Sequence, residues 1–249
     1  PDLDTYNRDT LLRMPNDPSA FAGPTMLADT FRVEADGTAT LAGVYLRSSA
    51  LPAPRGTIIL LHDERKVRDS LAGIARSLAD SGFAVVVYDQ RASGLSTGEY
   101  HGDGRMEAAD LQAVIGHLGI HNQLTQPLIV VGWKIGADAA LTTSAEEKRI
   151  DAVLAIEPYL STDRLLDSYR HEASCLWLPL WRTILWFWYN ARSSYGLDYR
   201  DADELTGIRC RTVVMLADDQ RQSPAVMTLS AKSGTQLQLA PTTADANKS

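Results

Sequence analysis

"PLIVVGWKIGADAAL", residues 127–141, joins a run of strand-forming residues to a helix-forming run through two glycines. The apolar, β-branched residues of "LIVV" predict a buried strand, and the small and apolar residues after Gly136 predict a helix. Glycine at positions 132 and 136 allows a sharp change of backbone direction between the two elements. We therefore expect a tight strand-to-helix turn with Lys134 at its tip.

The same alternation of strand and helix patterns extends over most of the chain. Strand patterns occupy residues 31–35, 40–46, 56–61, 83–89, 127–132, 151–157, 211–216 and 235–240, and helical patterns occupy residues 69–82, 105–119 and 135–148. Nearly continuous Val, Ile and Leu strands between amphipathic helices predict a mostly parallel sheet covered on both faces. The expected class is a doubly wound α/β fold. Residues 1–30 lack periodicity and are expected to form an N-terminal surface arm, with one domain over residues 31–249.

Composition limits the possible partners and cofactors. A chain of 249 residues that is 45% apolar can bury one large core. Its formal net charge of −7 argues against nucleic acid as a partner, because phosphate backbones are bound by clustered Lys and Arg. Cys175 and Cys210 indicate neither a disulfide framework nor a metal site. No cluster with metal-ligand spacing and no nucleotide-binding glycine loop is evident, so no cofactor is expected.

The turn and two longer segments resemble one known family. Gly132-Trp133-Lys134-Ile135-Gly136 resembles the G-x-S-x-G nucleophile elbow, with Lys in place of Ser. "IILLHDERKVRDSLAGIARSLADSGFAVVVYDQRASGLSTGE" is similar to the strand, His-Gly loop, helix, strand and Arg-Gly-x-Gly-x-Ser turn of the α/β-hydrolase superfamily, in its lysophospholipase and serine-aminopeptidase-like branch. "YGLDYRDADELTGIRCRTVVMLADDQRQSP" is similar to the segment that carries the catalytic acid in that branch. The resemblance extends over about residues 31–245 and implies the α/β-hydrolase fold.

The positions that the resemblance assigns to the catalytic triad do not carry triad residues. Acyl transfer by this fold requires a hydroxyl nucleophile, an imidazole and an orienting carboxylate. The resemblance places Lys134, Gln220 and Asp245 at the nucleophile, acid and histidine positions. An ammonium group has no lone pair unless burial lowers its pKa. The histidines are His62, His101, His117, His121 and His171, and none follows the acid segment.

The oxyanion side of the implied site is altered as well. The resemblance assigns the two oxyanion N–H groups to Glu64 and Ile135, and Asp63 replaces a glycine in the same loop. Two acidic side chains there would repel a developing oxyanion. The ammonium of Lys134 is expected to pair with Asp63 or Asp245, with Asp219 as a third candidate, because it would lie beside a helix N-terminus.

Other polar residues of the matched segments are expected to be structural. They are His62, Asp89, Arg91, Arg105 and Glu107. Nothing in the sequence marks Ser93 or Ser96 of the same loop as a nucleophile, because neither has a histidine at a predictable distance. Two functions follow from the altered site. The first is a catalytically silent α/β-hydrolase-fold protein that acts as a binding or scaffolding subunit of a complex. The alternative is an active esterase or lipase with unorthodox catalytic residues.

The segment "CLWLPLWRTILWFWYNARSSYG", residues 175–196, is rich in tryptophan. In the resembled branch this region forms a cap over the active site, here at about residues 162–200, and a buried hydrophobic cap is the simpler interpretation. The alternative is a docking surface for a protein or a membrane surface, made by Trp177, Trp181, Arg182, Trp186 and Trp188. We expect at least two of the four tryptophans to be exposed. The apolar run is shorter than the roughly 20 residues needed to span a bilayer.

Overall fold

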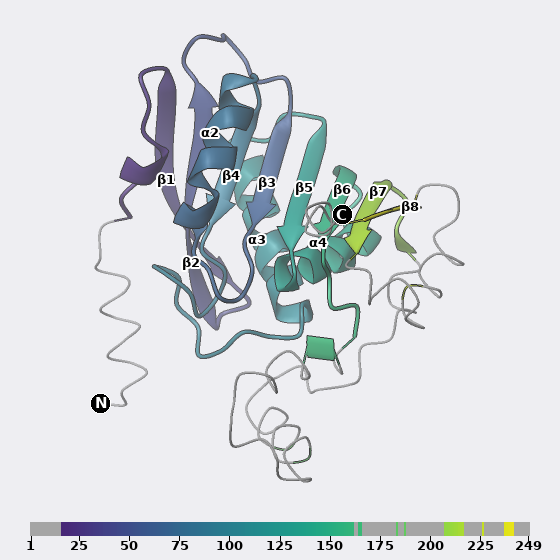
Figure 1. Ribbon diagram of the computed structural model, residues 1–249. Helices are drawn as coiled ribbons and strands as arrows, with labels where there is room; N and C mark the ends of the chain where they lie inside the picture. Colours follow the sequence, from purple (N-terminus) through teal and green to yellow (C-terminus); the bar gives the residue numbers. More distant parts are fainter. Residues whose placement is uncertain are drawn as a thin grey trace, which may run out of the picture.

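The computed structural model describes residues 16–161, 164–165, 183, 187, 207–216, 226 and 237–241 (Figure 1). The elements in chain order are η1 (Ser19–Phe21), β1 (Met26–Ala35), β2 (Ala39–Ser48), β3 (Thr57–Leu61), η2 (Arg68–Leu71), α2 (Ala72–Asp80), β4 (Ala84–Tyr88), α3 (Arg105–Ile120), β5 (Leu128–Trp133), α4 (Ile135–Glu146), β6 (Ile150–Ile156), β7 (Arg211–Leu216) and β8 (Leu237–Pro241). Each strand and helix expected from the sequence is present, with ends that differ by a few residues.

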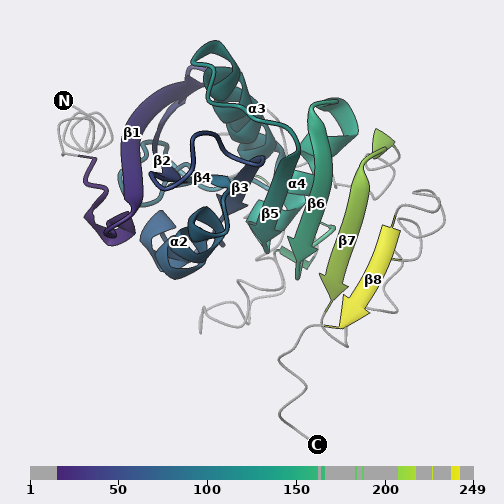
Figure 2. The same cartoon turned by 90° about the horizontal axis from the view of Figure 1, so that it is seen from above.

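The strands form one twisted sheet in the order β1-β2-β4-β3-β5-β6-β7-β8 (Figure 2). β1 and β2 pair antiparallel, and β2 also pairs antiparallel with β4. All pairs from β4 to β8 across the sheet are parallel. The predicted α/β class with a mostly parallel sheet is therefore confirmed.

Helices cover both faces of this sheet. α2 lies on one face, and α3 and α4 lie together on the other (Figures 1 and 2). Alternate residues of β3 explain this arrangement, because successive side chains of a strand point to opposite faces. Ile58 and Leu60 pack with α2, whereas Ile59 and Leu61 pack in the larger core under α3 and α4. No helix within the described residues is long and apolar enough to span a membrane.

The N-terminal region joins the fold earlier than the sequence pattern indicated. β1 begins at Met26, inside the stretch expected to be a surface arm, and pairs with β2 from its first residue. Phe21 is fully buried in the core beneath α2. The Asn16 side chain donates hydrogen bonds to the carbonyl oxygens of Phe31 and Gly43, at 2.9 and 3.0 Å. Isolated apolar residues between prolines give no periodic pattern, so the sequence did not reveal these contacts.

Replacement of Phe21 tests the contribution of this segment. We expect Phe21→Ala to lower the free energy of unfolding by about 3 kcal/mol, because a fully buried ring is removed and a cavity remains. Urea denaturation of the full chain measures the change. Ile120→Ala is the control, since Ile120 is 81% exposed and should change stability by less than about 0.5 kcal/mol. Equal effects of the two substitutions would show that the segment does not stabilise the core.

Candidate functional site

Lys134 lies at the tip of a strained turn between β5 and α4. Its backbone angles are φ 51° and ψ −114°, in a region that residues other than glycine rarely occupy. The Lys134 N–H donates to the carbonyl oxygen of Ile156 at 2.9 Å, and the Lys134 carbonyl accepts from Ala137 and Asp138. The turn is thus fixed to β6 on one side and begins α4 on the other. The predicted strand-to-helix turn is confirmed.

The two glycines of the turn are required by close backbone contacts. A Cβ atom on Gly136 would lie 2.8 Å from the carbonyl oxygens of Leu61 and His62, at the end of β3. A Cβ atom on Gly132 would overlap the Gly136 carbonyl. Real Cβ atoms do not approach backbone this closely, so the turn, the first turn of α4 and the end of β3 form one tightly packed unit.

A pair of Gly→Ala substitutions tests this packing. Gly136→Ala should lower the free energy of unfolding by about 1–3 kcal/mol, because the new methyl group meets backbone that has little room to move. Gly116→Ala is the control, since Gly116 lies within α3 and a Cβ there meets nothing within 4 Å. This control should raise stability by about 0.5–1 kcal/mol through helix propensity. Thermal or urea unfolding would reject the packing argument if Gly136→Ala also stabilised the protein.

The Lys134 side chain is half-buried and does not pair with Asp63. Asp63 instead lies 3.7 Å from the ammonium of Lys66 and accepts a hydrogen bond from the Arg65 N–H at 2.9 Å. The ion pairs of the described residues do not include Lys134. The predicted Asp63–Lys134 pair is therefore wrong, because aspartate binds more readily to nearby groups of its own turn. Asp219 and Asp245 lie outside the described residues.

Tyr159 connects the expected oxyanion loop to the helix after the turn. Its hydroxyl donates to Oε1 of Glu64 at 2.6 Å, and the Glu64 side chain is only 2% exposed. The Tyr159 N–H donates to Asp138 of α4 at 2.9 Å. The Tyr159 ring belongs to a small buried apolar cluster with Ile135 and Leu165. Both residues expected to supply oxyanion N–H groups, Glu64 and Ile135, thus contact one tyrosine that the sequence patterns did not single out.

The sheet order shows where this hydrogen bond runs. Glu64 follows β3 and Tyr159 follows β6, and β5 lies between these two parallel strands. Neighbouring strands are about 4.8 Å apart, so β3 and β6 are separated by about 10 Å, and the side chains of Glu64 and Tyr159 bridge the loops that follow them. Because β5 ends at the turn that carries Lys134, Glu64 and Tyr159 belong to the loops on either side of this turn in the strand order.

His62 has the structural role expected of it. Its Nδ1 lies 2.7 Å from the Asp63 carbonyl oxygen, and its Nε2 accepts a hydrogen bond from the Gln90 N–H at 3.0 Å. A carbonyl can only accept, so Nδ1 carries the proton and the ring is neutral. Burial lowers the pKa of His62. Both nitrogens are occupied, which leaves neither for proton transfer.

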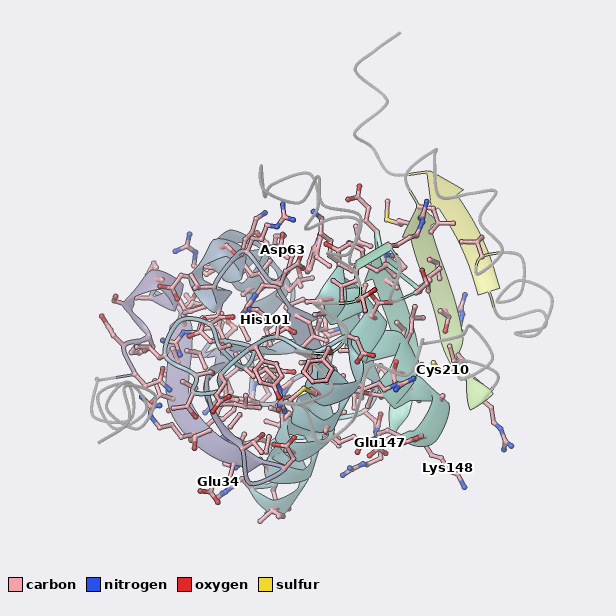
Figure 3. All side chains as sticks on the ribbon, turned by 90° about the horizontal axis from the view of Figure 1, so that it is seen from below. Glu34, Asp63, His101, Glu147, Lys148 and Cys210 are labelled. Carbon is pink, nitrogen blue, oxygen red and sulfur yellow. The ribbon has the colours of Figure 1, made fainter. Side chains whose placement is uncertain are left out.

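His101 is a second buried imidazole near the same loop, and no sequence motif drew attention to it. Figure 3 labels His101 and Asp63, which come from the loops after β4 and β3. Burial lowers the pKa of His101, and it contacts the main chain of Glu64. Its Nδ1 lies 3.9 Å from the Glu107 carboxylate. We find His101 within the wall of the site, held between Glu64 and the start of α3.

The loop between β4 and α3 is held by buried ion pairs and hydrogen bonds. Arg91 contacts Asp110 at 2.6 Å and Asp36 at 3.2 Å. Glu107 accepts from the N–H groups of Gly102 and Gly104 at 2.6 and 3.0 Å, which caps α3. Similar local contacts hold Asp89, which lies 3.7 Å from Arg68, and Ser96, which accepts from the Ala42 N–H. The structural roles expected for Asp89, Arg91 and Glu107 are confirmed.

Asp110 makes folding depend on pH. Burial raises the pKa of Asp110 to about 7 from its ordinary value of 3.8, although Arg91 opposes this shift. The folded state therefore holds the proton more tightly than the unfolded state. This contribution to stability is greatest at a pH below the ordinary pKa of 3.8, and it is lost as the pH rises to about 7.

Asp110→Asn should remove this pH dependence. In the unchanged protein, Asp110 should contribute a fall of up to about 4 kcal/mol in the free energy of unfolding between pH 4.5 and 7.5. The variant should show a flatter profile, even if it is less stable throughout. Asp29→Asn, an exposed position, is the control and should keep the original slope. Identical slopes for Asp110→Asn and the unchanged protein would contradict the shift.

Several residues expected at the site lie outside the described residues. They are Gln220, Asp245, Trp177, Trp181, Arg182, Trp186 and Trp188, so their positions stay predictions. Among the residues that the structure does describe, no group of three or more His, Cys, Asp or Glu side chains could hold a metal ion. Within this part of the chain, the candidate site is the turn at Lys134 with Glu64, Tyr159 and the two buried imidazoles around it.

Comparisons with known proteins agree with this geometry. Residues 52–205 match the serine aminopeptidase family, S33, and the chain belongs to this α/β-hydrolase family. An esterase from Pyrococcus furiosus has a similar structure, with 18% identity, a TM-score of 0.68 and coverage of 92% of this chain and 86% of the esterase. A bacterial brefeldin A esterase, a homologue of human hormone-sensitive lipase, is 16% identical with a TM-score of 0.62, and the alignment covers 96% of this chain and 74% of that one. No curated protein sequence matches the chain.

Proposed function

We propose that this chain is a catalytically silent member of its family and acts as a binding or scaffolding subunit. The observation that carries the proposal is Lys134 at the strained turn, where the fold presents its nucleophile. The side chain at this position faces the site whatever its chemistry, because the backbone of the turn is fixed by Gly132 and Gly136. A protonated amine there cannot form the acyl intermediate that a serine forms.

The Tyr159–Glu64 hydrogen bond supports the same proposal. Oxyanion stabilisation needs N–H groups aimed at a water-excluded position where negative charge develops. Here Glu64, the residue expected to supply one of these N–H groups, has a buried carboxylate 2.6 Å from the Tyr159 hydroxyl. A carboxylate next to a developing oxyanion raises the energy of the transition state.

The tryptophan-rich segment is the proposed contact with a protein partner or a membrane surface. Phe187, the described aromatic residue of this segment, is 69% exposed. Large exposed apolar side chains are enriched where partners bind, and this supports the docking interpretation of Trp177, Trp181, Arg182, Trp186 and Trp188.

Activity-based labelling tests the proposal. The purified full chain should not react with a fluorophosphonate probe and should not hydrolyse p-nitrophenyl acetate or butyrate above the rate of heat-denatured protein. Lys134→Ser should also stay inactive, because both nitrogens of His62 are occupied and His101 is buried against the main chain of Glu64. A known family esterase serves as the positive control.

The outcomes separate the two candidate functions. Labelling that is lost in Lys134→Ala would support the alternative, an ester hydrolase with unorthodox residues, and would overturn catalytic silence. Esterase activity gained by Lys134→Ser would show that a working imidazole remains at the site. Absence of labelling in both proteins, together with full activity of the positive control, would support the proposal.

A further inference from the structure

Two histidines lie one helical turn apart at the end of α3. His117 is in the last turn of the helix, and His121 follows its final residue. The His121 N–H donates to the His117 carbonyl oxygen at 3.1 Å, which is the i to i−4 bond of an α-helix. Side chains at this spacing lie on the same face of a helix. The two imidazole rings accordingly lie close together, with centroids 4.3 Å apart and planes inclined by 46°.

The His117 ring is held in place by Phe31 of β1. The two rings are stacked, with centroids 5.1 Å apart and planes inclined by 26°. Phe31 is buried, and a Cβ atom on Gly43 of β2 would overlap its ring, so the phenyl group is itself tightly packed. α3 packs against β1 along this contact (Figure 2). One imidazole of the pair is therefore fixed by packing, whereas His121 is exposed and its ring is free to adjust.

The ring nitrogens of both histidines are available for a ligand. In the part of the chain that the structure describes, neither imidazole makes a hydrogen bond or an ion pair. This differs from His62, whose two nitrogens both have partners. A neutral imidazole has one nitrogen with a free lone pair, and such a nitrogen is the commonest protein ligand of transition metals.

The distance between the rings suits two ligands of one metal ion. Metal–nitrogen bonds of 2.0–2.1 Å at tetrahedral angles place two ligating nitrogens about 3.3 Å apart. Nitrogens on rings whose centroids are 4.3 Å apart reach this separation by rotation of the side chains alone. Histidines at positions i and i+4 of a helix also supply two of the zinc ligands in the H-E-x-x-H motif, for the same geometric reason.

We propose that His117 and His121 form a two-histidine site for a divalent transition-metal ion. Imidazole ligands favour Cu²⁺, Ni²⁺ and Zn²⁺, and the usual order of affinity places Cu²⁺ above the other two. Two protein ligands leave the remaining coordination positions to water, in contrast to the three or four protein ligands of catalytic and structural zinc sites. The site therefore binds an exchangeable ion.

The proposed metal site is separate from the elbow. β2, β4 and β3 lie between β1, which carries Phe31, and β5, which leads to Lys134. Strands this far apart in a sheet are separated by about 19 Å. Lys134→Ser should consequently bind Zn²⁺ as the unchanged protein does, and the metal site does not depend on whether the chain is catalytically silent.

Isothermal titration calorimetry with ZnCl₂ and CuCl₂ tests the proposal. The untagged full chain is first treated with EDTA and then dialysed free of it. We expect His117→Gln and His121→Gln each to weaken Zn²⁺ binding about tenfold or more, because chelation by two linked ligands is lost. Cu²⁺ should bind the unchanged protein more tightly than Zn²⁺ does.

The matched control moves one histidine by a single position. His121→Asn/Asn122→His keeps the composition and the number of histidines, but it turns the second imidazole away from His117. Asn122 has φ 55°, a region that histidine also tolerates. This variant should bind Zn²⁺ as weakly as His121→Gln does. Circular dichroism confirms that each variant folds.

Thermal unfolding gives a second readout. A bound ion links the last turn of α3 to the residue after it, so Zn²⁺ should raise the melting temperature of the unchanged protein and not that of the exchanged variant. Equal Zn²⁺ affinity in the unchanged protein and the exchanged variant would overturn the proposal. An affinity that His121→Gln leaves unchanged would overturn it as well, because the ion would then be bound elsewhere.

Discussion

The backbone contact between the end of β3 and the first turn of α4 is the constraint on which the site depends. Gly136 lies so close to the carbonyls of Leu61 and His62 that no side chain fits between them. This contact, together with the bond from the Lys134 N–H to Ile156, fixes the turn against the strands on both sides of it. Packing requires the glycines, but it places no requirement on the side chain at position 134. The geometry of the elbow can therefore persist when its chemistry is lost.

The charges around the turn also differ from those that acyl transfer needs. An ammonium occupies the nucleophile position, and carboxylates occupy the loop after β3. Asp63 is held by Lys66 and by the Arg65 N–H, whereas Glu64 is buried and bound to Tyr159. A buried carboxylate is costly unless it is hydrogen-bonded, so the Tyr159 hydroxyl stabilises the folded form of this loop. Tyr159 thereby joins the loop after β3 to the chain after β6.

Local patterns were sufficient to predict the sheet and the turn, because each depends on residues close in sequence. Local residue patterns alone indicate the strand "LIVV", the turn at the glycines 132 and 136 and the helix after them. The Tyr159–Glu64 bond joins residues 95 positions apart, and no periodicity in either segment indicates it. Phe21 likewise packs beneath α2 from a segment without a repeating apolar pattern. The Asp63–Lys134 pair was predicted from proximity alone, and the hydrogen bonds of the local turn prevailed over the longer-range attraction.

Helix α4 extends from the elbow at Lys134 toward the opposite edge of the sheet. It begins at Ile135 and ends at Glu146, shortly before β6, and its 12 residues extend over about 18 Å. At that separation, exposed charges are largely screened at physiological ionic strength, so Lys134 and the charged side chains at the opposite edge of the sheet act independently. The elbow and the opposite edge of the sheet therefore share packing but not charge, so a substitution of the side chain at position 134 leaves the charges of the opposite edge unaffected.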